Sequence, residues 1–319
     1  MTSSNLFGPD QPSGNALPEQ FDICKIPKFE LFKQSFALPF SDMKLLLLSV
    51  GVFLVPMLVY FAGLVLASVV GPITAVLVIP LFILMLMGMG GIMNEWIRKG
   101  LGFSQKYPTG IKRFYSGVWG NIGRLILIGI IGGFSSLIIF FLLSAIMTNF
   151  MGVHLFPTVG GKQELQVIFR QLFIYGAVMT LIFAFVLSYI FSRFGVDLVT
   201  GAMNEKNKLQ AQERVPFDAK LKGIFLPLSA TYVLASLLSV GISMIPVMIM
   251  TWEPRAGVYQ SLGEAAMIKS SLSWIMLPIS LLNILVSFYI FAVFSSMFGL
   301  AFRYRFGLTD EILEAIDRK

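Results

Sequence analysis

The sequence KLLLLSVGVFLVPMLVYFAGLVLASVVGPITAVLVIPLFILMLMGMGGIM, residues 44–93, decides the fold. It holds two apolar runs, 44–70 and 73–93, which carry no charge after Lys44 and are separated only by Gly71-Pro72. A helix rises about 1.5 Å per residue, so roughly 20 residues cross a hydrocarbon core about 30 Å thick. Gly and Pro are typical of a tight turn. The stretch therefore predicts a hairpin of two transmembrane helices.

The rest of the chain repeats this pattern. The composition is 56% hydrophobic and 13% charged, whereas soluble domains are roughly 45–50% apolar and about 25% charged. We therefore predict an all-α fold, a polytopic integral membrane helical bundle of about six transmembrane helices arranged as three hairpins within a membrane domain over residues 43–302. Four further apolar runs complete it, at residues 125–147, 167–191, 224–250 and 272–301.

The segments before the first span differ from it in composition. Residues 1–20 are rich in Ser, Gly, Pro and Asn, which predicts a flexible tail. Residues 21–42 place apolar side chains at helix-like spacing with lysines between them, as an amphipathic helix at the membrane interface would. An extended linker broken at Pro27 is the alternative. The apolar residues are Ile26, Phe29, Phe32 and Phe36, and the basic ones are Lys25, Lys28 and Lys33.

Two other segments predict short helices, the first of them at the headgroup level. Residues 107–119 place aromatic and aliphatic side chains on one helical face beside basic residues. Residues 303–319 predict a short C-terminal helix with Thr309 as its N-cap. The lysines and arginines of the first two amphipathic segments are candidate contacts to lipid headgroups. They are Lys25, Lys28, Lys33, Lys106, Lys112 and Arg113.

The distribution of basic residues predicts the orientation. With the N-terminus inside, twenty of the twenty-four Lys and Arg residues fall in inside segments. Such a bias in short loops predicts that both termini are cytoplasmic. The predicted location is the plasma membrane, namely the inner membrane of a bacterium. The four outside exceptions are Lys162, Arg170, Arg255 and Lys269.

Short similarities suggest that the hairpins are internal repeats. Arg193-Phe194-Gly195 follows the predicted fourth span, and Arg305-Phe306-Gly307 follows the predicted sixth. Three copies of a unit made of a leading helix, a span, an outer turn and a span are one interpretation. The other interpretation is that such short motifs match by coincidence.

The predicted spans offer no acid, base or nucleophile for catalysis. No Asp, Glu, Lys, Arg or His lies near the centre of any run, and Cys24 and His154 are the only residues of their kinds. Nucleotide-binding loops are absent from the sequence. We therefore expect neither an enzyme nor a cofactor, no metal site and no nucleic-acid partner. Asn283, beside Ser280 and Ser287, is the most polar position at a span centre, either as a ligand or pore contact or as a hydrogen-bonded fastening between helices.

These features favour a non-catalytic membrane protein. The first hypothesis is a subunit or scaffold of a membrane complex, or a protein that acts on the bilayer, with lipid and other membrane or cytoplasmic subunits as partners. The alternative is a transporter or channel with a neutral path lined by hydroxyl groups and Asn283. Gly129 and Gly133 form a small-xxx-small pair that predicts close packing of helices.

Overall fold

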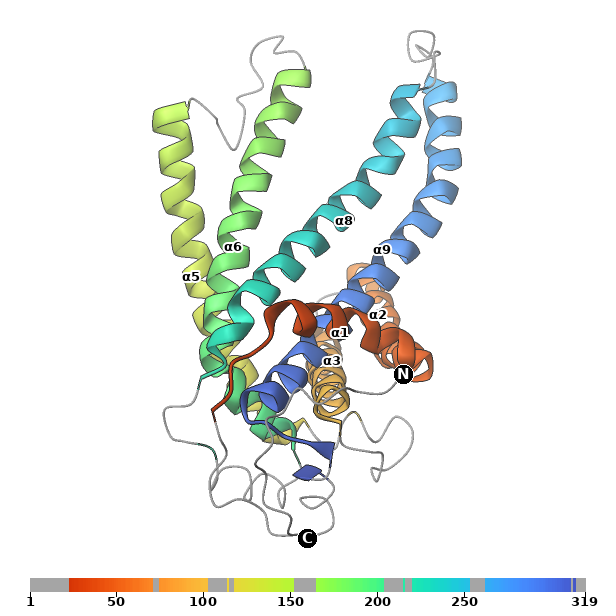
Figure 1. Ribbon diagram of the computed structural model, residues 1–319. Coiled ribbons are helices and arrows are strands. Elements are labelled where there is room, and N and C mark those ends of the chain that lie inside the picture. Colours follow the sequence, from red (N-terminus) through yellow and green to blue (C-terminus); the bar gives the residue numbers. More distant parts are fainter. Residues whose placement is uncertain are drawn as a thin grey trace.

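The computed structural model describes residues 23–70, 75–102, 118–151, 165–203, 220–252 and 262–310, with Phe114, Val215, Ile312 and Leu313. Every regular element in these ranges is helical, which confirms the all-α prediction (Figure 1). The elements are α1 (Lys28–Ser41), α2 (Met43–Val70), α3 (Ala75–Leu101), α5 (Trp119–Met151), α6 (Leu165–Ala202), the 3₁₀ turn η2 (Lys222–Ile224), α8 (Phe225–Trp252) and α9 (Leu262–Arg305).

Several of these helices are long and apolar enough to cross a membrane. The second predicted run lies on α3, which is not one of the helices found long and apolar enough. The part of α3 whose side chains are described carries three charged residues, Glu95, Arg98 and Lys99. The predicted count of six therefore stays a prediction, while the membrane-embedded character of the chain is supported. Five candidate spans lie in the described ranges, at Met43–Tyr60, Asn121–Ile146, Val178–Ala202, Lys222–Ile242 and Pro278–Arg305.

Two helices extend well beyond the C-terminal ends of their predicted runs. α3 continues past residue 93 to Leu101, and α6 continues past residue 191 to Ala202. The motif Arg193-Phe194-Gly195 therefore lies inside α6, whereas Arg305-Phe306-Gly307 ends α9. Gly307 has φ of +58°, and Leu308 N–H donates to the Arg303 carbonyl oxygen at 3.0 Å, as in a Schellman C-cap. The two motifs thus differ in their place along the helix, and the interpretation of the hairpins as internal repeats stays a prediction.

The long helices converge at one end of the molecule and separate at the other. α5 pairs with α6 and α8 pairs with α9, and the two pairs splay apart away from the end where α3, α6 and α9 finish (Figure 1). We call the convergent end the basal end and the splayed end the distal end. α3 packs against both α2 and α9.

The hydrophobic core lies at the basal end. Of the apolar window Pro278–Arg305 on α9, 61% is buried, whereas only 12% of the window Asn121–Ile146 on α5 is buried. α9 is therefore the central helix of the bundle and α5 a peripheral one. The largest side chains that are fully buried include Trp96, Phe114, Phe298, Phe302 and Phe306.

α1 lies across α8 and α9 near the basal end (Figure 1). It buries Leu31, Ser35 and Pro39 against the bundle, and the Tyr289 hydroxyl of α9 donates to the Phe36 carbonyl oxygen at 2.7 Å. Phe29 points away from the bundle with 80% of its surface exposed. A helix over most of residues 21–42 is therefore present, starting directly after Pro27, while its role at the interface stays a prediction. The predicted tail 1–20 lies outside the described residues.

The backbones of α3 and α9 touch at two glycines. A Cβ added to Gly100 of α3 would overlap the Ser296 carbonyl oxygen, and one added to Gly299 of α9 would overlap the Ile97 carbonyl oxygen. Glycine is required at both positions because only a residue without a side chain lets the helices approach this closely.

Gly100→Ala tests this crossing. The added methyl group meets backbone rather than a movable side chain, so α3 and α9 must separate. We expect a loss of about 2–3 kcal/mol in the free energy of unfolding, as for an overpacked core. Unfolding of the purified chain in mixed micelles of increasing denaturing detergent, followed by circular dichroism, measures it.

Gly51→Ala on α2 is the matched control. A Cβ at Gly51 meets no described atom within 4 Å, so the substitution should stabilise α2 by about 0.5–1 kcal/mol through helix propensity alone. Equal stabilities of the two variants would contradict a backbone contact at Gly100.

Candidate functional site

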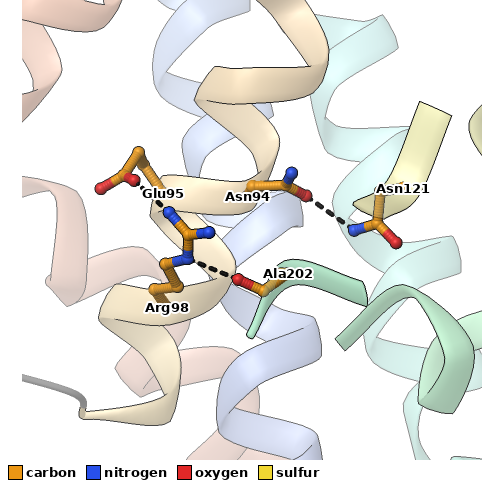
Figure 2. Close-up of polar contacts among 5 residues, drawn as sticks. All are labelled: Asn94, Glu95, Arg98, Asn121 and Ala202. Atoms are coloured by element: carbon orange, nitrogen blue, oxygen red, sulfur yellow. Dashed lines mark hydrogen bonds and ion pairs between the residues drawn. The ribbon is translucent and has the colours of Figure 1, made fainter. Parts of the chain in front are cut away.

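α3 carries three polar residues into the interior of the basal end. Glu95 is fully buried, and Asn94 and Arg98 are 1% and 6% exposed. Every residue of α3 from Gly90 to Arg98 is buried, so this part of the helix has no face on which a polar side chain could reach water. With Asn121 of α5, which is also buried, these residues form the basal polar cluster (Figure 2).

A buried ion pair is the most highly charged part of the cluster. Glu95 Oε1 and Arg98 Nη1 lie 2.6 Å apart, and Arg98 Nε donates to the carbonyl oxygen of Ala202, the last residue of α6 (Figure 2). The final carbonyls of a helix lack donors within the helix and form the negative end of its dipole. Arg98 therefore caps α6 while its charge is balanced by Glu95.

Two asparagines connect the other helices. Asn121 Nδ2 donates to Asn94 Oδ1 at 2.7 Å and to the Leu198 carbonyl oxygen at 2.9 Å, so one amide group links α5 to both α3 and α6. An amide nitrogen has two hydrogens and can make both bonds at once. Arg124 Nη1 donates to Asn121 Oδ1 at 3.4 Å. Gly201 of α6 leaves space for the Asn121 side chain, because a Cβ at position 201 would overlap Asn121 Oδ1.

Two further contacts join α2 to the same part of α3. Lys99 Nζ lies 2.9 Å from Asp42 Oδ2, and Asp42 Oδ1 accepts a hydrogen bond at 3.1 Å from the Leu45 N–H in the first turn of α2. Trp96 Nε1 donates to Ser49 Oγ at 3.2 Å within the core. The polar residues of α3 thus reach α2, α5 and α6.

The geometry of the cluster suits positioning of helices. Glu95, Arg98 and Asn94 each have interactions beyond those described above, so their polar atoms are engaged with the protein itself. A buried polar group without a partner costs about 1–3 kcal/mol, and a buried charge more. The cluster therefore fixes how α3, α5 and α6 meet. Within the described ranges, no three His, Cys, Asp or Glu side chains are grouped so as to hold a metal ion.

The structure places the predicted contact residue Asn283 between two helices. Ser239 Oγ of α8 donates to Asn283 Oδ1 of α9 at 3.2 Å, and Ser287 Oγ donates to the Asn283 carbonyl oxygen at 2.7 Å. Asn283 is half-buried, whereas Ser280 and Ser287 are exposed. The three residues do lie on one helix, and the hydrogen bond from Ser239 favours a fastening role. A pore or ligand contact stays a prediction.

The predicted headgroup contacts are only partly within the described residues. Lys28 and Lys33 of α1 are exposed, and so is Lys25 just before this helix. Whether they touch lipid stays a prediction. Lys106, Lys112 and Arg113 lie outside the part of the chain that the structure describes.

The basal polar cluster was not predicted from the sequence. The sequence predicts a second apolar run that ends at residue 93, which places Asn94, Glu95 and Arg98 in an inside connection. The available signal was the i, i+3 spacing of Glu95 and Arg98 with apolar residues on the remaining faces, Ile92, Trp96 and Ile97. This pattern indicates a helix that is buried on all sides and pairs its charges internally.

Arg98→Met tests the buried ion pair. It leaves Glu95 without its ion-pair partner and Ala202 without its cap, so we expect a loss of about 3–5 kcal/mol in the free energy of unfolding. Glu95→Leu should be similarly destabilising. The double variant Glu95→Leu/Arg98→Met should lose less than the sum of the two, because it buries no unpaired charge.

The pair between Arg303 and Asp310 supplies the control. It lies 2.9 Å apart, with the Asp310 side chain 79% exposed, and removing an exposed pair costs about 0–1 kcal/mol. Asp310→Asn should therefore leave the unfolding transition nearly unchanged. Additive losses in the Glu95/Arg98 cycle would contradict the coupling of these two side chains.

Asn283→Leu tests the fastening between α8 and α9. Hydrogen bonds between membrane helices contribute about 0.6–2 kcal/mol, so Asn283→Leu and Ser239→Ala should each reduce the stability by this amount. Their losses should not add, because both remove the same bond. Ser280→Ala, at an exposed position on the same helix, is the control. A change in solute flux through reconstituted vesicles, with stability unaltered, would contradict a fastening role.

The basal polar cluster and the exposure of the helices are the observations on which a functional proposal for this chain rests. No protein-family model matches it, and neither does a curated protein or a solved structure.

Proposed function

We propose that the chain is a non-catalytic integral membrane protein that serves as a subunit or scaffold of a membrane assembly. The observation that carries the proposal is the exposure of α5, of whose apolar window only 12% is buried, the lowest share among the candidate spans. α5 packs mainly against α6. A helix so little used within its own bundle has most of its surface available to a partner helix.

A stripe on the exposed side of α5 has the composition of a helix–helix contact. Ile126, Ile130 and Leu137 are exposed along it, and a Cβ added to Gly129 or Gly133 would meet no described atom within 4 Å. The close packing predicted for this glycine pair is therefore not found among the described parts of the chain. Small residues at i and i+4 let a second transmembrane backbone approach, which supports a partner at this stripe.

The polar residues support a non-catalytic role. Glu95 and Arg98 are paired with each other at 2.6 Å, and Asn283 accepts a hydrogen bond from Ser239. These groups hold helices together, which is what a scaffold requires of them. A transport path through Asn283 would require this side chain to face the solute. The contacts of Asn283 therefore do not support the alternative function, a transporter or channel.

We infer that the basal end faces the cytoplasm of a bacterial cell. Basic residues of the described ranges gather there, and Arg170 and Lys269 are the exceptions, near the distal starts of α6 and α9. Cytoplasmic segments of membrane proteins carry an excess of Lys and Arg. This orientation would put both chain ends inside, and the splayed hairpins would then reach toward the outer leaflet.

A Gly129→Leu/Gly133→Leu variant tests the proposed subunit contact. Both side chains point into open space within the chain, so folding should be unaffected, whereas a partner helix would be pushed away. We expect the unaltered chain to run as an assembly larger than the monomer after gentle extraction into native-lipid nanodiscs, and the variant to be mainly monomeric. Light scattering of the purified particles measures the mass.

Ala145→Leu is the matched control, since Ala145 is an exposed residue of α5 on a different face. It places the same leucine side chain on another face of the same helix and should leave the assembly intact. A monomeric mass for the unaltered chain in native lipid would contradict the proposed function, and so would an assembly that both variants preserve.

A further inference from the structure

Two lysine-bearing segments that are far apart in the sequence meet at the basal end. Ile26, just before α1, is buried, and a Cβ added to Gly223 of η2 would lie 2.7 Å from the Ile26 Cβ. The backbone at Gly223 therefore packs directly on the Ile26 side chain. Each side of this contact carries lysines at neighbouring positions, Lys25 and Lys28 on one segment and Lys220 and Lys222 on the other.

Chain geometry brings these lysines close together. Consecutive Cα atoms are about 3.8 Å apart, so the Cα atoms of Lys25 and Lys222 lie within about 13 Å of each other across the contact. A lysine ammonium group reaches several ångströms from its Cα. Lys25, Lys28 and Lys222 are exposed and Lys220 is half-buried. The ammonium groups of Lys25 and Lys222 are therefore within reach of one small anion, and Lys28 and Lys220 add charge on the same two segments.

No described carboxylate neutralises these lysines. The ion pairs of the described residues join Glu95 to Arg98, Asp42 to Lys99 and Asp310 to Arg303. Glu30, the acidic residue in the first turn of α1, accepts a hydrogen bond from Gln34 at 2.9 Å. The surface formed by Lys25, Lys28, Lys220 and Lys222, which we call the lysine patch, therefore presents four basic side chains that none of the ion pairs given above involves.

The lysine patch lies at the ends of two apolar windows, which is where a bilayer would place its headgroups. The apolar window of α8 begins at Lys222 and that of α9 ends at Arg305. Cys24 N–H donates to the Arg305 carbonyl oxygen at 2.7 Å, and Arg305 Nη1 donates to the Cys24 carbonyl oxygen at 2.8 Å, which holds the segment before α1 at this level.

The outward side of α1 is apolar next to this charge. Phe29 is 80% exposed on the side of α1 that faces away from the bundle. Phe40 is 65% exposed, and its ring packs against that of Tyr289 on α9, with the ring centroids 4.9 Å apart. A helix that presents phenylalanine beside lysine suits the boundary between acyl chains and headgroups. An acidic protein surface would satisfy the lysines but would leave Phe29 without an apolar environment, so the observations favour lipid.

We infer that the lysine patch binds the headgroup of an anionic phospholipid, whose phosphodiester lies among Lys25, Lys28, Lys220 and Lys222 while its acyl chains contact Phe29. The inference does not depend on the proposed subunit contact, since the patch is at the basal end and α5 contributes nothing to it. Basic residues beside a membrane attract anionic lipid through the negative surface potential.

Native mass spectrometry of the delipidated full chain in detergent tests the site. Phosphatidylglycerol and phosphatidylcholine with identical acyl chains are titrated separately, and the first bound lipid is counted. We expect phosphatidylglycerol to bind at least about ten-fold more tightly. Lys222→Gln should weaken its binding by roughly five-fold, the equivalent of about one lysine contact. Lys222→Arg, which keeps the charge, should retain binding.

Lys44→Gln is the matched control. Lys44 is an exposed basic residue at the basal end, but α1 separates it from the patch by about 20 Å. An equal loss with Lys44→Gln and Lys222→Gln would overturn the site, because only net charge would then matter. Equal binding of the two lipids would overturn it as well. Displacement of bound phosphatidylglycerol by millimolar glycerol 3-phosphate would reassign the patch to a free phosphate ester.

Discussion

The contact between the backbones of α3 and α9 at Gly100 and Gly299 determines much of the remaining structure. A Cβ on either glycine would overlap a carbonyl oxygen of the other helix, so the two helices approach as closely as helices can. The approach places α3 in the centre of the basal end. Every residue from Gly90 to Arg98 is buried as a result, and a central helix of this kind can carry polar side chains only if its neighbours provide partners.

The partners come from the ends of helices. The Ala202 carbonyl at the end of α6 has no donor within its own helix and accepts from Arg98. The Leu198 carbonyl, one turn earlier, accepts from Asn121. The start of α5 contributes Asn121, and Gly201 of α6 leaves room for it. A polar cluster is directional, unlike apolar packing, and therefore selects one arrangement of α3, α5 and α6 at the basal end. Its burial inside protein keeps the charges of Glu95 and Arg98 away from lipid.

The sequence predicts the helices because apolar runs longer than twenty residues have few other structures open to them. It does not predict where α3 ends, because Glu95 and Arg98 lower the local hydropathy although they are paired inside the protein. The lysine patch could not be found from the sequence either, since Lys25 and Lys222 are brought together only by the contact of Ile26 with Gly223. The glycine pair on α5 was recognised as a packing motif, yet the sequence does not say which helix it meets.

The contrast between the two ends follows from the solvent that surrounds each. At the basal end, glycine contacts, a buried ion pair and capped helix ends together hold the bundle, and none of them depends on the hydrophobic effect. The distal hairpins carry apolar windows of the candidate spans. Inside a membrane, an exposed leucine or phenylalanine costs nothing and helices associate mainly through close packing. Asn121 already holds α5 at the basal end, so α5 does not need its glycine stripe for packing against the described helices of its own chain.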